Sequence, residues 1–247
     1  MKRFLHFFAV AILMSACVKP NDSNESITTR FSILGDSYSA FEGYVDPNTN
    51  AVYQYEEIGV TGPEQMWWHI LSTKKEWQLE RNNSFSGALI CNFNYVDYYG
   101  PYSFIRRMDG LGNPDVIFIF GATNDACAHE LNEPNQHVVA LGDYIYSDWT
   151  EEQLCDFRPA LAYLFDHLKT RYPNAKLYFL LDMDLGSGGI DVERRDAFIE
   201  SIHHISNHYS VDCIDLFDIH KNRWHPDAKG QKDIANQILN YLEIEAV

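Results

Sequence analysis

One short segment constrains the fold of this chain more than any other. Residues 116–120 read VIFIF, with no polar side chain among them. A strand that is apolar at every position belongs in the middle of a parallel sheet, where helices cover both of its faces. Parallel neighbours must be joined by crossovers, usually helices, so this segment predicts a chain in which strands and helices alternate.

The rest of the sequence shows that alternation. Strand-like runs are expected at residues 30–34, 78–84, 116–120, 176–181 and 211–217. Helices are expected from a capping box at residues 61–64 through Leu71, from a second box at residues 150–153 to about Arg171, and over residues 191–208 and 227–242. This order predicts an α/β fold in one domain, with a parallel sheet covered on both faces.

The composition is that of a folded, acidic protein. Apolar residues make up 46% of the 247, which is enough to build a core and rules out a disordered chain. Lys and Arg number 19 against 35 Asp and Glu, a formal charge of −16. We expect no nucleic acid partner, because nucleic-acid binding requires a basic surface. The charge equally disfavours direct adsorption to an anionic membrane.

The first residues are typical of export rather than of the fold. Lys2 and Arg3 precede an apolar run over residues 4–14, and small residues then lead to Cys17. The run is too short to span a bilayer, so residues 1–16 are interpreted as a signal peptide. The segment resembles a bacterial lipoprotein signal, which implies lipidation of Cys17. The alternative is an ordinary secretory signal followed by a chance cysteine.

This interpretation divides the chain into three parts. Residues 1–16 are removed, residues 17–29 form the lipidated Cys17 and a polar tether, and residues 30–247 form the folded domain. No later segment is apolar for long enough to cross a membrane, so membrane contact is expected only through Cys17. We expect an exported protein anchored to a bacterial membrane, on the periplasmic or surface face of the outer membrane.

Four further cysteines and a histidine pair leave several structural options open. In an exported protein, Cys91, Cys127, Cys155 and Cys213 could form two bridges in three connectivities, and Cys127–Cys155 is the pair that we consider for a bridge. Cys213 lies in an apolar strand and is expected to be a buried free thiol. His204 and His208 have the i, i+4 spacing of zinc ligands but lack the H-E-x-x-H glutamate, so we expect them to face solvent.

Polar blocks follow four of the five expected strands, at the sheet edge where α/β proteins place their sites. They are Gly35-Asp36-Ser37-Tyr38-Ser39, Asn83-Ser84-Phe85-Ser86-Gly87, Gly121-Ala122-Thr123-Asn124-Asp125 and Trp224-His225-Pro226-Asp227. The first is not the G-x-S-x-G elbow of α/β-hydrolases, because position 39 is Ser.

Together the four blocks resemble the SGNH (GDSL-type) hydrolase family over about residues 31–242. The resemblance implies a flavodoxin-like three-layer α/β/α sandwich with a five-stranded parallel sheet. It implies that Ser37 is the nucleophile and His225 the general base. The oxyanion hole would comprise the backbone N–H groups of Ser37 and Gly87 and the side-chain amide of Asn124. The family hydrolyses esters and thioesters, and no metal or organic cofactor is required.

The chain departs from the family pattern at one position. The family usually has an Asp three residues before the catalytic His, and this chain has Asn222. Asn222 or a backbone carbonyl would orient His225 in a Ser–His dyad, another carboxylate such as Asp218 or Asp227 would serve, or the site would be weakened. We favour the dyad, because Ser37, Gly87, Asn124 and His225 are all present.

Aromatic residues near these blocks suggest the substrate. They are Tyr44, Tyr53 and Tyr55, then Tyr95, Tyr98, Tyr99, Tyr102 and Phe104, and finally Trp224. Such rings suit stacking on sugars, although core packing would account for about half of them. We therefore expect a carbohydrate (acetyl)esterase whose partner is a small-molecule or glycan ester. A lysophospholipase or thioesterase of the same family and a weakened, glycan-binding surface protein are the alternatives.

Overall fold

The computed structural model describes residues 28–46, 55–93, 102–127, 139–185 and 190–245. Its main sheet has five strands, which are β1 (Arg30–Gly35), β2 (Gln78–Ser84), β3 (Val116–Phe120), β4 (Lys176–Asp182) and β5 (Asp212–Leu216). All four neighbouring pairs are parallel, in the order β2-β1-β3-β4-β5. This is the flavodoxin-like order, and all five expected strands are confirmed.

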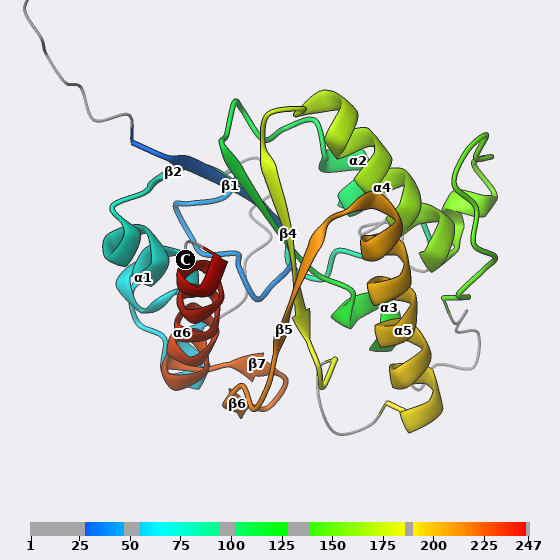
Figure 1. The fold of residues 1–247 in the computed structure, drawn as a ribbon. Helices are drawn as coiled ribbons and strands as arrows, with labels where there is room; N and C mark the ends of the chain where they lie inside the picture. The colour runs from blue at the N-terminus through cyan, green and yellow to red at the C-terminus, as the bar shows by residue number, and fades with distance from the viewer. Residues whose placement is uncertain (1–27, 47–54, 94–101, 128–138, 186–189, 246–247) are drawn as a thin grey trace, which may run out of the picture.

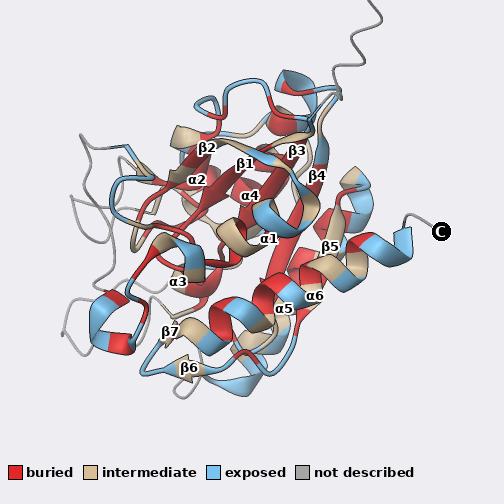
Figure 2. Ribbon diagram, turned by 90° about the vertical axis from the view of Figure 1, so that its left-hand side faces the viewer, coloured by how far each residue is buried: buried red, intermediate tan, exposed pale blue. Residues whose placement is uncertain are grey.

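Helices cover both faces of the sheet, which confirms the three-layer architecture (Figure 1). On one face lie α1 (Trp67–Lys75) and α6 (Ala228–Glu245). On the other lie α4 (Phe157–Arg171) and α5 (Val192–Tyr209), with the short helices α2 (Phe104–Arg107) and α3 (Thr123–Cys127). Figure 2 shows buried residues along the strands, with exposed residues along α6, which faces the viewer.

Strand β3 explains why its segment is apolar throughout. Ile117 and Ile119 pack into the core beneath α4 and α5, whereas Val116, Phe118 and Phe120 pack into the core beneath α1 and α6. Successive side chains of a strand point to opposite faces. A strand covered on both sides therefore has no position left for a polar residue.

Two helices begin later than their capping boxes predict. In the first box the Thr61 N–H donates to Gln65 Oε1 at 2.6 Å, so Gln65 and not Glu64 is the partner, and the box ends in a single 3₁₀ turn before α1. In the second, Thr150 and Gln153 bond reciprocally as expected, but again around a 3₁₀ turn. Helix α4 begins after Asp156, whose ψ of 150° is extended.

A small hairpin that the sequence pattern does not predict follows β5. Strands β6 (Lys221–Asn222) and β7 (His225–Pro226) pair antiparallel, with Lys221 opposite Pro226 and Asn222 opposite His225. The expected signal peptide, Cys17 and most of the expected tether lie outside the described residues. Within the described part of the chain, no helix is long and apolar enough to cross a membrane.

Candidate active site

Ser37 lies directly beyond the carboxyl end of β1, in a tight turn. The Tyr38 N–H donates to Asp36 Oδ1 at 2.9 Å, which fixes the turn around the serine. Gly35 is required by close packing, because a Cβ at this position would lie 2.6 Å from Ser84 Oγ. Ser37 is itself 5% exposed. The glycine and the aspartate before the serine therefore shape the turn that presents it.

The hairpin after β5 brings His225 to this serine. His225 Nε2 lies 2.9 Å from Ser37 Oγ, although 188 positions separate the two residues. Tyr38 helps to hold the hairpin, since its hydroxyl donates to the Trp224 carbonyl at 2.8 Å and its ring centre lies 5.5 Å from that of His225. The Tyr55 hydroxyl donates to the Ser37 carbonyl. The residues expected as nucleophile and base are thus in direct contact.

The surroundings of His225 set its charge. Burial among these rings lowers the pKa of His225 from 6.5 to about 4, because a buried imidazolium loses hydration. The imidazole is therefore neutral at pH 7. A neutral imidazole at hydrogen-bond distance from a serine hydroxyl is able to accept its proton.

The structure places the three residues considered for orienting His225. Asn222 lies opposite His225 in the hairpin, and its side chain makes no hydrogen bond to another described residue. Asp227 is engaged elsewhere, because it accepts from the Gly230 N–H at 3.0 Å and pairs with His220 Nδ1 at 2.7 Å. Asp218 is exposed, with a positive φ of 51°. Asn222 is thus the only one of the three aligned with His225 across the hairpin.

Besides Ser37, the residues expected in the oxyanion hole come from the second and third blocks. Gly87 has a φ of 81°, a conformation that favours glycine. Asn124 lies in the first turn of α3, and its Nδ2 donates to the Ala88 carbonyl at 3.0 Å and to Asp36 Oδ2 at 3.2 Å. The Asn124 amide therefore bridges the turn of the nucleophile and the turn of Gly87.

Asp36 is a buried carboxyl at the centre of this arrangement. Burial raises its pKa to about 7, and the negative charge of Asp125 adds to the increase. The Tyr38 N–H and the positive charge of Arg107 oppose it. When ionised, Asp36 can only accept hydrogen bonds and so fixes the Asn124 amide with its N–H groups directed to oxygen.

Sequence reasoning missed the residues that tie the blocks together. Asp125 accepts from the backbone N–H groups of Ile90 and Cys91, which fixes the segment after Gly87 against α3. Arg107 of α2 donates from Nη2 to the Gly35 carbonyl at 3.0 Å. The position of Asp125 directly after Asn124 was a signal that could have been used, whereas Arg107 lies in a stretch with no helix or strand pattern.

The cysteines do not pair as considered. Cys91, Cys155 and Cys213 are free thiols, so the Cys127–Cys155 bridge is wrong. Cys127 Sγ contacts the Leu185 carbonyl after β4, whereas Cys155 contacts the turn before α4. Cys213 is a free thiol as expected, but it is only partly buried.

The aromatic residues expected near the site lie only partly within the described part of the chain. Tyr55 and Phe104 are buried in the core, and Tyr102 stacks on Phe85 at 4.2 Å. Trp224 is 49% exposed and Tyr44 is 41% exposed. Tyr53, Tyr95, Tyr98 and Tyr99 lie outside the described residues. Among the described members of this aromatic set, Trp224 and Tyr44 are thus the exposed ones that a ligand can reach.

The arrangement is suited to acyl transfer. A serine hydroxyl beside a neutral imidazole is a nucleophile that can attack a carbonyl carbon. Amide N–H groups nearby can stabilise the oxyanion that such an attack produces. None of these steps involves a metal ligand or an organic group.

Comparison with known proteins gives a consistent picture. A family model described as GDSL-like lipase/acylhydrolase matches residues 29–242. The structure of a protein described as a GDSL-like lipase from Bacteroides ovatus ATCC 8483 is 47% identical with a TM-score of 0.76, and the match covers 87% of this chain and 98% of that one. A similar protein from Bacteroides uniformis ATCC 8492 is 35% identical with a TM-score of 0.75, covering 87% and 96%. No curated protein matches the chain.

A more distant structure shares the fold. It is a family two carbohydrate esterase from Clostridium thermocellum in complex with cellohexaose, 14% identical with a TM-score of 0.58. The match covers 88% of this chain and 64% of that one. At this identity the likeness extends to the fold alone.

Proposed function

This chain belongs to the GDSL-like lipase/acylhydrolase family and is an ester hydrolase, and we propose that it acts through an acyl intermediate on Ser37. The observation that carries this proposal is the 2.9 Å contact between Ser37 Oγ and His225 Nε2 at the carboxyl edge of the sheet. A serine hydroxyl is a weak nucleophile until an adjacent base accepts its proton.

In the proposed first step, His225 Nε2 takes the hydroxyl proton while Ser37 Oγ bonds to the ester carbonyl carbon. The resulting oxyanion accepts hydrogen bonds from the N–H groups of Ser37 and Gly87 and from the Asn124 amide. The protonated His225 then gives its proton to the leaving alcohol as the C–O bond breaks. In the second half, His225 takes a proton from water as the water oxygen bonds to the acyl carbon. The protonated His225 then returns this proton to Ser37 Oγ as the bond between Ser37 Oγ and the acyl carbon breaks, and the acid product leaves.

Asp36 has a supporting part in this mechanism. Its carboxylate accepts one N–H of the Asn124 amide, so the amide group cannot turn its oxygen toward Asp36. Fixed donors stabilise an oxyanion better than mobile ones, because no reorganisation is needed when charge develops. The other N–H of Asn124 Nδ2 donates to the Ala88 carbonyl, so that bond would give way to the oxyanion while Asp36 keeps the amide in place.

We propose an acylated carbohydrate as the substrate, with a short acyl group such as acetate. Trp224 adjoins His225 in the chain and is 49% exposed, a position from which its ring would stack on a sugar beside the scissile ester. The formal charge of −16 favours neutral over polyanionic glycans. The distant carbohydrate esterase supports only the suitability of the fold.

We further propose that the protein is exported and anchored through a lipid on Cys17. The support is the order of charged, apolar and small residues before Cys17. Metabolic labelling of the full chain in a bacterial host with a fatty acid analogue tests this. Labelling of wild type that disappears in Cys17→Ala is expected, and equal labelling of both proteins would contradict the anchor.

The serine mechanism is tested with a fluorophosphonate probe and p-nitrophenyl acetate. Wild type should be labelled and should release nitrophenol, and Ser37→Ala should do neither. Ser147→Ala is the matched control, since Ser147 is exposed and bonds only to neighbouring Asp148 among the described residues. Labelling that persists in Ser37→Ala, or wild type that is not labelled, would overturn the proposal.

The substrate class is tested separately. Faster turnover of acetate than of octanoate esters would favour sugar deacylation, and the reverse order would favour the lipase or lysophospholipase alternative. On an acetylated oligosaccharide, Trp224→Ala should raise KM while leaving turnover of p-nitrophenyl acetate unchanged. Phe217→Ala is the control, because Phe217 is a similarly exposed aromatic residue, at 55%. Equal KM values for wild type and Trp224→Ala would exclude stacking by this ring.

A further inference from the structure

We propose that His203, Cys213 and Asp215 form a zinc-binding site between α5 and the edge strand β5. One ligand atom from each residue lies within 4.8 Å of the other two. His203 Nε2 is 2.8 Å from Asp215 Oδ1, and Cys213 Sγ is 3.6 Å from the same oxygen. Nothing in the proposed esterase mechanism uses these residues.

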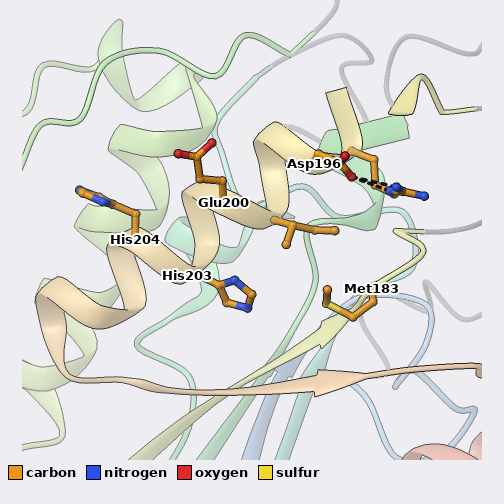
Figure 3. A pocket seen from close by; sticks show the side chains of 7 residues that line it. Met183, Asp196, Glu200, His203 and His204 are labelled. Atoms are coloured by element: carbon orange, nitrogen blue, oxygen red, sulfur yellow. Dashed lines mark hydrogen bonds and ion pairs between the residues drawn. The ribbon is translucent and has the colours of Figure 1, made fainter. Parts of the chain in front are cut away.

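The fold brings the three side chains together in a simple way. Cys213 and Asp215 are two positions apart on β5 and so face the same side of the sheet. Figure 3 shows the His203 ring turned from α5 toward β5, whereas His204 points away. All three residues are partly buried. His203 and Asp215 have side-chain exposures of 37% and 31%, so a cation can reach them from solvent.

The ligand set is chemically suited to zinc. Imidazole nitrogen, thiolate sulfur and carboxylate oxygen are all common ligands of Zn²⁺, at about 2.0–2.3 Å. Tetrahedral geometry at these lengths separates neighbouring ligand atoms by about 3.3–3.6 Å. The sulfur–oxygen distance of 3.6 Å already fits, and the nitrogen–oxygen distance of 2.8 Å must widen by about half an ångström.

A fourth position would remain for water. An open hollow of about 610 Å³ borders His203 and is also lined by Met183, Ile199 and Glu200. This hollow reaches His203 from solvent. Three protein ligands with one open position is a common zinc arrangement.

The alternative is a metal-free hydrogen bond between His203 and Asp215, with the Cys213 thiol nearby. Coordination of a metal by the Cys213 sulfur distinguishes the zinc site from this alternative. Zinc binding would replace the S–H bond with an S–Zn bond and release the proton to solvent. The metal would then link α5 to the strand at the sheet edge.

The site is expected to stabilise the fold rather than to assist ester hydrolysis. In the sheet, β5 is separated from β1, which leads to Ser37, by β3 and β4. A ligand that binds only the folded state raises its stability in proportion to the logarithm of its concentration. Zinc should therefore raise the melting temperature and leave turnover of p-nitrophenyl acetate unchanged.

The experiment titrates the purified, metal-free protein with Zn²⁺ by calorimetry and with Co²⁺ by absorption spectroscopy. We expect one tight site per chain and a sulfur-to-cobalt charge-transfer band. Cys213→Ser should remove the band, and His203→Ala should weaken zinc binding by at least about tenfold. His204→Ala and Cys127→Ser are the matched controls, a neighbouring histidine and a second partly buried thiol, and both should bind as wild type does.

Control measurements distinguish the loss of a zinc ligand from misfolding of a variant. Circular dichroism of each metal-free variant checks its fold, and Asp215→Asn supplies a third ligand variant if Cys213→Ser is unfolded. Absence of saturable zinc binding by wild type would overturn the proposal. A cobalt spectrum that lacks the sulfur band, or that survives in Cys213→Ser, would overturn it equally.

Discussion

At the scale of single residues, the environment of His225 decides how the site works. The imidazole lies near the rings of Tyr38 and Tyr55 and contacts the Ser37 hydroxyl. These groups are uncharged at neutral pH, so they do little to stabilise an imidazolium, and burial favours the neutral form. A base of this kind is neutral, and so able to accept a proton, at every pH above its own pKa.

The first prediction concerns the acid limb of the pH profile. His225 is active when neutral, and burial lowers its pKa from 6.5 to about 4. As pH falls, kcat/KM for p-nitrophenyl acetate should therefore stay level through pH 6.5 and decline only near pH 4. Rates measured across this range, with circular dichroism to check folding, test the expectation. A decline centred near 6.5 would mean that His225 is solvated as in a free peptide.

The second prediction concerns the position opposite His225. An Asp at position 222 would place a negative charge across the hairpin, and residues directly opposite have Cβ atoms about 5 Å apart. The charge stabilises imidazolium, so Asn222→Asp should raise the pKa of His225 and move the acid limb of kcat/KM upward by about one pH unit. The shift is modest because position 222 is exposed.

Asn222→Ala is the control for this shift, because it removes the amide without adding a charge. Its acid limb should coincide with that of wild type. An Asn222→Asp profile superimposable on wild type would show that position 222 does not act on His225, and would direct attention to backbone groups of the hairpin.

At the scale of elements, the sequence predicts what periodicity and local chemistry encode. Four of the five strands are visible because each is an apolar or alternating run, whereas β2 has a single apolar residue. Ser37, Gly87, Asn124 and His225 could be proposed because the polar blocks after the strands resemble those of a known family. The β6–β7 hairpin could not be predicted, since strands of two residues have no period. The contacts of Arg107 with the carbonyls of Gly35 and Asn83 were equally hidden, because both partners are backbone groups distant in sequence.

The hairpin instead depends on a buried ion pair. Lys221 Nζ lies 2.7 Å from Asp182 Oδ2, and the two side chains are 5% and 2% exposed. Asp182 ends β4, and its other oxygen accepts from the Asp184 N–H at 3.2 Å. Because Lys221 pairs with Pro226 and the next residue, Asn222, pairs with His225, the ion pair attaches the imidazole-bearing hairpin to the sheet.

The third prediction tests Lys221 as a positioning residue. Lys221→Met leaves Asp182 buried without its cation, which should destabilise the protein by about 3–5 kcal/mol. The loosened hairpin should lower kcat for p-nitrophenyl acetate more than it changes KM, since the substrate-contacting residues remain. Urea unfolding and steady-state kinetics on the same samples measure both effects.

Two further variants distinguish the loss of the buried ion pair from nonspecific effects of removing a lysine. Lys229→Met is the matched control, because Lys229 pairs with Asp233 on the exposed side of α6 and should contribute less than about 1 kcal/mol. Adding Asp182→Asn to Lys221→Met removes the unpaired charge and should recover part of the stability but not kcat. An unchanged kcat in Lys221→Met would rule out a positioning role.

At the scale of the whole molecule, the two halves of the core share one sheet. The side chains of β3 and β4 alternate between the core beneath α1 and α6 and the core beneath α4 and α5. Neither helix layer can separate without exposing side chains of the same strands. No disulfide bridge links the layers among the described residues, so this packing holds the layers together.

The last prediction follows from that shared sheet. Phe118 is fully buried, with ring centres of Trp67 and Tyr178 at 5.7 and 5.5 Å, so Phe118→Ala should cost about 3–5 kcal/mol through the lost contacts and the cavity. Phe217→Ala removes the same side chain at 55% exposure and should change stability by less than about 0.5 kcal/mol.

In urea, tryptophan fluorescence reports mainly on the α1–α6 face, where Trp67 and Trp68 lie, and far-ultraviolet circular dichroism reports on both faces. The two signals should give one midpoint for each protein, lower in Phe118→Ala. Separate midpoints would mean that the layers unfold independently and that residues 30–247 are not one cooperative domain.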